Sequence, residues 1–322
     1  MMTPQPLDFE RPILDLENQL EELLRQAERS EVDLGAQIAS MRETLGATQH
    51  NIYANLTAWQ RVQIARHPQR PFMLDYVAAC FEDFTELHGD RHIGDDHSMP
   101  CGCARLEGRP VVVVGHQKGR HTKENLLRNF GSAHPEGYRK ALRLMRLGEK
   151  FRLPVVAFID TPGAFPGIGA EERNIAEAIA FNLREMMRLR TPTVAVVIGE
   201  GGSGGALGIG VADRVLMLEN AYYSVISPEG CAAILWKHRQ HAPQAAEALR
   251  LTAGDLLQLG LIDGVVPEPV GGAHHLPSAA TSAVKAAVLA ALDELGAKPV
   301  DRLLAERYEK FRRFGAWAEA AG

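Results

Sequence analysis

The sequence has no apolar run that approaches the roughly 18 residues needed to cross a bilayer. Its first residues, MMTPQPLDFERP, lack the basic and then apolar layout of a signal peptide, so we expect a cytoplasmic protein. Only four cysteines are present and none forms a CxxC pair, which favours reduced thiols over disulfides. A net charge of −5 and a pI near 6.2 argue against general nucleic-acid binding, because phosphate neutralisation needs a basic surface.

Common metal and nucleotide motifs are also missing. The segment HGDRHIGDDH, at 88–97, is rich in His and Asp, but its spacing matches neither HExxH nor an EF-hand. Its glycines and Arg91 favour a solvated loop. Cys101 and Cys103 form a single C-x-C, which we interpret as small residues at the start of a strand. No GxxxxGK[ST] occurs, so we expect neither a P-loop nor a metal bound by this chain.

What is present is the composition of an ordinary globular protein of 322 residues, with 46% hydrophobic and 23% charged residues. We predict a helical arm over 1–68, an α/β core over 69–270 and a C-terminal helical segment over 271–322, joined by the linker GGAHH at 271–275. In the arm, apolar residues recur at spacings of three, four and seven. This pattern predicts an antiparallel helix pair, with a turn near 29–33, that serves packing or oligomerisation.

The core contains continuous Val, Ile and Leu runs, which are typical of parallel strands buried on both faces. The runs are RPVVVVGHQ, LPVVAFIDTPG, TPTVAVVIGEGG and DRVLMLENAYYSVISPEG. Helical periods separate them, so we predict an α/β sheet. In the helix near Tyr138–Met145 we expect the basic side chains to face largely away from the core; these are Arg139, Lys140, Arg143 and Arg146.

The strongest local signal is GEGGSGG, at 199–205, which follows one predicted strand and precedes a short apolar helix. Gly199, Gly201 and Gly204 fit the dinucleotide-binding G-x-G-x-x-G, with Glu219 as its acid, although the helix is short for such a site. The same loop also fits the nucleophile elbow G-x-S-x-G of serine hydrolases, with Ser203 as nucleophile. The acid and base of a triad would then come from Asp255, Asp263, His274 and His275.

A third interpretation of this loop needs no side chain. Gly204 and Gly205 leave adjacent backbone N–H groups bare at a helix N-terminus, where orphan donors and partial positive charge favour an oxyanion. Each such donor is typically worth about 3 kcal/mol to a transition state. A second glycine- and proline-rich loop, IDTPGAFPGIGAEER at 159–173, follows the preceding strand. Because both loops leave the carboxyl ends of parallel strands, we expect them to line one crevice.

A basic stretch follows the first long strand. Residues 118–152 contain ten Lys or Arg against three Glu, a local balance of +7. Lys118, Arg120, Lys123 and Arg128 come soon after the strand ends, where they suit a carboxylate or phosphate. A solvated basic face is the alternative.

These residues and several longer blocks resemble the alpha subunits of bacterial acetyl-coenzyme A carboxylase carboxyltransferases. The matching blocks are LDFERPI, ARHPQRP, GHQKGR, RNFG, PEGYRKALRLM, FIDTPGA, VIGEGGSGGALGIG, YSVISPEGCA and VPEP followed by GGAH. They cover nearly the whole chain. The resemblance implies a crotonase-like (ClpP/crotonase) α/β fold, a spiral of ββα units with an N-terminal helical arm and C-terminal helices.

The resemblance also implies a reaction. The family transfers carboxylate from N-carboxybiotin, on a separate biotin carboxyl carrier protein, to acetyl-CoA, giving malonyl-CoA for fatty acid biosynthesis. Carboxybiotin releases CO₂, the ureido anion takes a methyl proton from acetyl-CoA, and the enolate attacks CO₂. Both anions need hydrogen-bond donors more than they need a protein base.

For the site, the resemblance implies that the N–H groups of Gly204 and Gly205 form the oxyanion hole on the biotin side. The expected substrate-binding residues are Gly201, Gly202, Ser203, Ala206, Thr161, Pro162, Gly163, Lys118 and Arg120.

The resemblance implies several partners and an enzyme that is inactive alone. A beta subunit, in a heterotetramer of two alpha and two beta chains, would supply the enolate's hole, most of the coenzyme A site and a zinc ribbon. A separate biotin carboxylase would use ATP, and this chain would bind no cofactor directly. We expect no membrane or nucleic-acid partner. The competing hypotheses are a self-sufficient serine hydrolase that uses Ser203 and a purely structural subunit whose arm organises an assembly.

Overall fold

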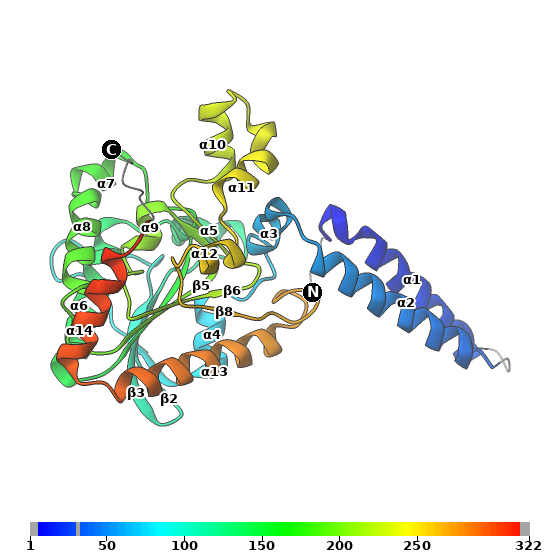
Figure 1. Ribbon diagram of the computed structural model, residues 1–322, viewed down its shortest axis with the longest axis horizontal. Coiled ribbons are helices and arrows are strands. Elements are labelled where there is room, and N and C mark those ends of the chain that lie inside the picture. The colour runs from blue at the N-terminus through cyan, green and yellow to red at the C-terminus, as the bar shows by residue number, and fades with distance from the viewer. Residues whose placement is uncertain (1–5, 30–32, 316–322) are drawn as a thin grey trace, which may run out of the picture.

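The computed structural model describes residues 6–29 and 33–315 (Figure 1). Within them, an eight-stranded mixed sheet has the order β1-β2-β3-β4-β5-β6-β8, with β7 beside β5. The strands are β1 (Glu82–Glu86), β2 (Cys101–Leu106), β3 (Arg109–Gly115), β4 (Val155–Thr161), β5 (Thr193–Gly202), β6 (Arg214–Leu218), β7 (Tyr222–Ser224) and β8 (Gly264–Val266). The predicted Val-rich runs are therefore strands, and the pairs from β3 to β8 are parallel, as expected.

The sequence explains both kinds of strand pairing. Every residue of β4 and β5 is buried, which is why these strands read as continuous apolar runs. In contrast, β2 and β3 form an antiparallel hairpin around Glu107 and Gly108. Both turn residues have positive φ, at 49° and 72°, which matches the right-handed twist of paired strands. Cys101 and Cys103 lie in β2, which confirms the expected start of a strand.

Helices cover both faces of the sheet (Figure 1). The helical elements of the core are α3 (Ala58–Ala65), α4 (Met73–Cys80), α5 (Thr122–Leu127), η2 (Asn129–Gly131), α6 (Pro135–Phe151), α7 (Ile168–Glu172), α8 (Ile175–Met186) and α9 (Ser203–Leu207). Those that follow are α10 (Pro228–Leu235), η3 (Arg239–His241), α11 (Ala242–Leu249), α12 (Ala253–Gln258), α13 (Pro277–Gly296) and α14 (Val300–Arg312). Helices α6 and α8 pack together on one face, and α4 and α13 pack together on the other.

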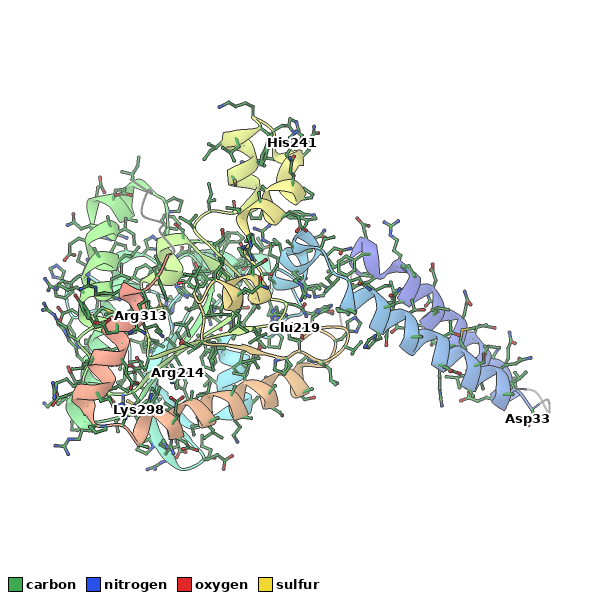
Figure 2. The ribbon with its side chains drawn as sticks, viewed as in Figure 1. Asp33, Arg214, Glu219, His241, Lys298 and Arg313 are labelled. Carbon is green, nitrogen blue, oxygen red and sulfur yellow. The ribbon has the colours of Figure 1, made fainter. Side chains whose placement is uncertain are left out.

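The predicted arm is an antiparallel pair of helices, α1 (Arg11–Arg29) and α2 (Gly35–Ala54), preceded by the short helix η1 (Asp8–Glu10). It projects from the body, and Figure 2 shows Asp33 at its far end. Residues 30–32 of the predicted turn lie outside the described residues. At its base, Ile13 and Tyr53 pack against Ile64 of α3. A second projection, formed by α10 and α11, carries His241 (Figure 2). The domain boundaries proposed from the sequence stay a prediction.

One expectation about polar segments was wrong. The basic side chains of α6 do not all point to solvent, because Lys140 is fully buried and pairs with Asp95 at 2.5 Å. Segment 88–97 is a loop with most of its residues exposed, as expected, but its Asp90 and Asp96 are buried and Asp90 pairs with Arg139. The two segments neutralise each other, which removes most of the cost of burying either charge.

The C-terminal helices close the core. Arg307 of α14 is buried and binds both carboxylate oxygens of Asp213 at 2.7 Å. The GGAHH segment precedes α13 as predicted, although four of its five residues are buried. No helix among residues 6–29 and 33–315 is long and apolar enough to span a membrane.

Candidate functional site

Two glycine-containing loops lie against each other at the carboxyl ends of β4 and β5. The register of these parallel strands places Thr161 beside Gly201. The approach is close, since a Cβ atom on Gly202 would lie 2.2 Å from the carbonyl oxygen of Pro162. The structure thus brings together the loops 161–163 and 201–205, as the sequence predicted.

Helix α9 begins within the second loop. Gly202 is its N-cap and supplies no side-chain hydrogen bond, so the N–H groups of the first turn, including Gly204 and Gly205, have no intrahelical acceptor. A Cβ on Gly205 would lie 2.5 Å from the backbone nitrogen of Ala164, whereas one on Gly204 would come no closer than 3.8 Å to any atom outside its own helix turn. Only the first of these two positions therefore requires glycine for packing.

Ser203 adopts a left-handed conformation, with φ of 52°. Such a conformation is unfavourable for a residue with a side chain. The strained residue links the end of β5 to the start of α9. The chain therefore turns sharply here, and the first N–H groups of the helix follow the turn directly.

A buried charge cluster lies beneath the two loops. The Lys118 ammonium, which follows β3, contacts Asp160 at 2.6 Å and Glu200 at 3.1 Å. Asp160 precedes Thr161, and Glu200 precedes Gly201, so each strand end contributes one carboxylate. Asp160 also accepts a hydrogen bond from the backbone N–H of Glu200, at 2.9 Å. An ammonium has three N–H donors, and two are used here, which leaves one for a ligand.

Electrostatics keep two members of this cluster ionised, whereas burial raises the pKa of the third, Asp160. Burial alone would raise the pKa of the Glu200 carboxyl, but Lys118 and Arg66 outweigh it and lower the pKa to about 2. Burial would lower the pKa of Lys118, and the two carboxylates reverse that effect and raise it. Lys118 therefore stays protonated, and Glu200 stays ionised, throughout the neutral range.

Glu200 connects the cluster to the projection formed by α10 and α11. Arg66 binds Glu200 at 2.5 Å and Glu229 of α10 at 2.5 Å. Tyr222 of β7 also donates to Glu200, at 2.9 Å. Sequence analysis did not single out Glu200, Arg66 or Tyr222. Arg66 and Glu200 were visible only as members of the blocks ARHPQRP and VIGEGGSGGALGIG, and Tyr222 only as the residue before YSVISPEGCA, because the contacts join residues far apart in the chain.

Arg120 lies in a different environment from Lys118. Its guanidinium donates to the carbonyl oxygens of Pro68 and Arg70, pairs with Asp75 and stacks on the Phe72 ring. These contacts hold the segment that precedes α4. The expected roles of Lys118 and Arg120 in substrate binding stay predictions.

Neither side-chain interpretation of the glycine loop is supported by the geometry. For a hydrolase, His274 and His275 lie with Glu10, Asp263 pairs with Lys310 and Asp255 with Arg250. Among the described residues, no hydrogen bond joins any of these four candidates to Ser203. For a dinucleotide site, α9 has only five residues, too few for a Rossmann crossover helix. Glu219, labelled in Figure 2, accepts a hydrogen bond at its backbone carbonyl from Arg61 of α3, and its carboxylate accepts from the backbone N–H of Glu268.

The described residues contain one group with the composition of a metal site. Glu10, His274 and His275 have ligand atoms within 4.8 Å of one another. However, the Glu10 carboxylate already accepts hydrogen bonds from Tyr53 and from the backbone of Leu7, and it contacts His274 at 3.3 Å. These bonds satisfy the carboxylate without a metal. The group ties the arm to the body.

Two cavities help to place the site. An apolar cavity of about 260 Å³ adjoins Ser203 and Gly204 and is walled by Leu207, Tyr223 and Phe311, among others. A larger one, of about 900 Å³, lies at the amino-terminal ends of β3, β4 and β5, at Arg109, Pro154 and Pro192. Ligands of such sheets bind at the carboxyl ends, so we assign the smaller cavity to the site.

Comparisons with known proteins identify the family. The family described as acetyl co-enzyme A carboxylase carboxyltransferase-like matches residues 6–315. The acetyl-coenzyme A carboxylase carboxyl transferase subunit alpha of Thermus thermophilus is 57% identical over 314 residues, 98% of this chain and 99% of that protein. The same subunit of Thioalkalivibrio sulfidiphilus is 54% identical over 318 residues, 99% of this chain and 100% of that protein. The chain belongs to this carboxyltransferase alpha-subunit family.

Solved structures of carboxyltransferases and a decarboxylase share the fold. Transcarboxylase 12S aligns with a TM-score of 0.56 and 20% identity, over 68% of this chain and 40% of that one. The beta subunit of Pseudomonas aeruginosa geranyl-CoA carboxylase aligns with a TM-score of 0.54 and 18% identity, over 76% of this chain and 46% of that one. A Pseudomonas malonate decarboxylase hetero-tetramer aligns with a TM-score of 0.55 and 19% identity, over 69% of this chain and 91% of that one. The expected crotonase-like fold is confirmed.

Family membership decides between the enzyme classes. Alpha subunits of this family belong to a multi-subunit, biotin-dependent carboxyltransferase, so the prediction of a transferase is confirmed over that of a serine hydrolase.

Proposed function

We propose that this chain forms the biotin-side wall of a carboxyltransferase site that it shares with a beta subunit. The site would move a carboxyl group from carboxybiotin, held on a biotin carboxyl carrier protein, to acetyl-CoA, giving malonyl-CoA. The observation that carries the proposal is the start of α9, where uncapped N–H groups are presented beside the tightly packed 161–163 loop.

The residues at this loop fit a compact ligand that becomes anionic. Carboxybiotin supplies CO₂ and leaves negative charge on its ureido oxygen, which requires donors. The N–H groups of Gly204 and Gly205 would donate hydrogen bonds to that oxygen, because they lack intrahelical acceptors and lie at the positive end of a helix. The adjoining cavity of about 260 Å³ would receive an apolar ring system beside them. Gly201, Gly202, Ala206 and the 161–163 loop would shape its rim.

Lys118 and its carboxylates would hold the two loops in register. The ammonium bridges the residues that precede each loop, so it fixes their separation, and its remaining N–H can approach a substrate carboxylate. A rigid arrangement suits a hole made of backbone donors, because donors that are already oriented need not reorganise during the reaction.

A rim of exposed apolar side chains supports a partner at this edge. Leu126, Leu127 and Phe130 follow β3, Ile168 follows β4 and Val225 follows β7, and each is more than half exposed. These segments and the glycine loop all follow the carboxyl ends of parallel strands, so they lie toward the same end of the sheet. Such clustering on one side is typical of a protein interface.

The other components follow the family. A heterotetramer of two alpha and two beta chains, with zinc and most of the coenzyme A site on beta, would complete the enzyme. Biotin carboxylase would consume ATP to carboxylate the carrier. The cytoplasmic location stays a prediction.

Two variants, measured in the complex with a beta subunit, test the oxyanion hole proposed for the backbone N–H groups of Gly204 and Gly205. In Gly205→Val, the side chain would collide with Gly163 and Ala164, so malonyl-CoA formation should fall at least about a hundredfold. The measurement is kcat for malonyl-CoA formation, together with subunit assembly by gel filtration. An assembled G205V complex that works near the wild-type rate would contradict the proposal and favour a structural subunit.

Ser203→Ala is the second variant, and it separates a transferase from a hydrolase. Because the proposed donors are backbone N–H groups, turnover should stay within about fivefold of wild type. Loss of essentially all turnover would instead identify Ser203 as a nucleophile.

A further inference from the structure

A histidine buried beneath the glycine loop takes no part in the mechanism above. His116 follows β3, is completely inaccessible to solvent, and donates its backbone N–H to the carbonyl of Phe158 at 3.0 Å. Within the described residues, neither of its ring nitrogens has a hydrogen-bond partner. A buried polar group without a partner lowers the free energy of unfolding, so an apolar residue would make a more stable core here.

The surroundings of this ring lead to Gly205. The His116 ring lies 6.4 Å from the Tyr138 ring, centroid to centroid, and the Tyr138 hydroxyl donates to the Gly205 carbonyl at 3.2 Å. The imidazole lies close enough to the backbones of Gly205 and Phe158 for both to affect its pKa, although neither contact is a complete hydrogen bond. Both rings therefore lie below the first turn of α9.

A third side chain extends this support. Asn182 of α8 donates to the carbonyl of Tyr138 and to that of Gly208, each at 2.9 Å. The N–H of Gly208 in turn binds the carbonyl of Gly204 at 2.9 Å. The carbonyl side of α9 is thus tied to the core by polar groups, while its N–H groups remain available.

We propose that His116 is a positioning residue, which with Tyr138 holds the Gly205 peptide from below and so fixes the direction of the Gly204 and Gly205 N–H groups. The inference rests on the proposed function, because it assumes that these N–H groups bind the reacting anion. Hydrogen bonds at active sites are often long in the free protein and shorten in the reacting complex. The imidazole would complete its bond to the Gly205 carbonyl at that stage.

The protonation state of His116 suits this role. Burial, with help from the positive charge of Lys118, lowers its pKa to about 3. Lys118 is the charged group that acts on the ring, and the carboxylates that contact its ammonium, Asp160 and Glu200, raise its pKa and keep it protonated. His116 therefore stays neutral between pH 6 and pH 9, and should add no ionisation to the pH profile of activity.

The test compares His116→Phe and His116→Gln in the alpha–beta complex. Phe fills the site without ring nitrogens, so kcat should fall about 10- to 100-fold with little change in KM for acetyl-CoA. The melting temperature should stay the same or rise, because an unpaired polar group has been removed. Gln can again present an N–H to the Gly205 carbonyl, so it should recover a substantial part of kcat.

Tyr76→Phe is the matched control. The Tyr76 hydroxyl is also buried without a partner, but its ring stacks on Phe158 in the core, 5.6 Å away. This variant should also keep or raise the melting temperature, and it should leave kcat unchanged. A double variant, H116F with Y138F, should lose less than the product of the single losses, because both residues act on one carbonyl.

Several results would overturn the proposal. Wild-type kcat in an assembled H116F complex would do so, as would a loss in H116F that H116Q does not relieve. Removal of an ionisation near neutral pH would make His116 a proton carrier instead. G205V separates the two proposals: if G205V is inactive while H116F is fully active, only the positioning role fails, and if G205V is active, the proposed hole itself fails.

Discussion

At the scale of single residues, the sequence predicted the charge of Lys118 and its place after a strand, but not the residues that it contacts. These two features suggested a free cation for an anionic ligand. The structure surrounds it with Asp160 and Glu200, which are 42 and 82 positions away in the chain. The glycines of the loop were easier to recognise, because the N–H groups of such a site come from consecutive residues. The charge cluster was harder to recognise, because its three members come from the ends of three different strands.

The Lys118 cluster makes a prediction about stability. In Lys118→Met, two buried carboxylates lose their shared cation, and breaking such a pair costs about 3–5 kcal/mol of unfolding free energy. The measurement is urea unfolding of the full chain, with kcat measured in the complex. Adding Asp160→Asn should recover part of the stability by removing one buried charge, although not the activity. A K118M chain as stable as wild type would show that this cluster does not support the loops.

At the scale of elements, a strand or helix was predictable where its own residues show a clear hydrophobic pattern. Strands β4 and β5 were predictable because burial of both faces gives a continuous apolar run, and α1 and α2 were predictable from the helical spacing of their apolar residues. Strand β8 and strand β1 gave no such signal, because β8 has three residues and β1 is largely polar and exposed. The pairing of α6 with segment 88–97 was also missed, since each segment alone resembles a solvated charged surface.

The attachment of the arm makes a prediction about pH. Burial would raise the pKa of Glu10, but hydrogen bonds from His274 and Tyr53 outweigh it and lower the pKa to about 2. A carboxyl whose pKa is lowered on folding stabilises the fold above its ordinary value of 4.5, and this contribution is lost as the pH falls toward 2. Glu10→Gln should therefore melt below wild type at pH 7, and the difference should shrink below pH 4.5.

Thermal unfolding of wild type and E10Q at several pH values checks this prediction. Asp15→Asn, an exposed acid on α1, is the matched control and should melt like wild type throughout. A constant difference between E10Q and wild type from pH 7 to pH 3 would show that the Glu10 contacts do not depend on its charge.

At the scale of the whole molecule, the exposed surface matters as much as the core. Exposed apolar side chains follow the carboxyl ends of β3, β4 and β7, toward which the glycine loop also lies, and a solitary protein would be expected to bury such a group. The fold class could be predicted from the alternation of buried strands and helices. The division of the site between two chains could not be derived from that alternation, because the pattern of one chain contains no information about a partner chain. The expectation of a shared site came from the resemblance to the family.

The most direct test of the shared site is malonyl-CoA formation from acetyl-CoA and carboxybiotin. It should be measured for this chain alone, for a beta subunit from the same source alone, and for the two mixed, with assembly followed by gel filtration. We predict activity only in the mixture, since each chain would supply one wall of the site. Full activity of this chain alone, or a folded and assembled complex without activity, would contradict the account.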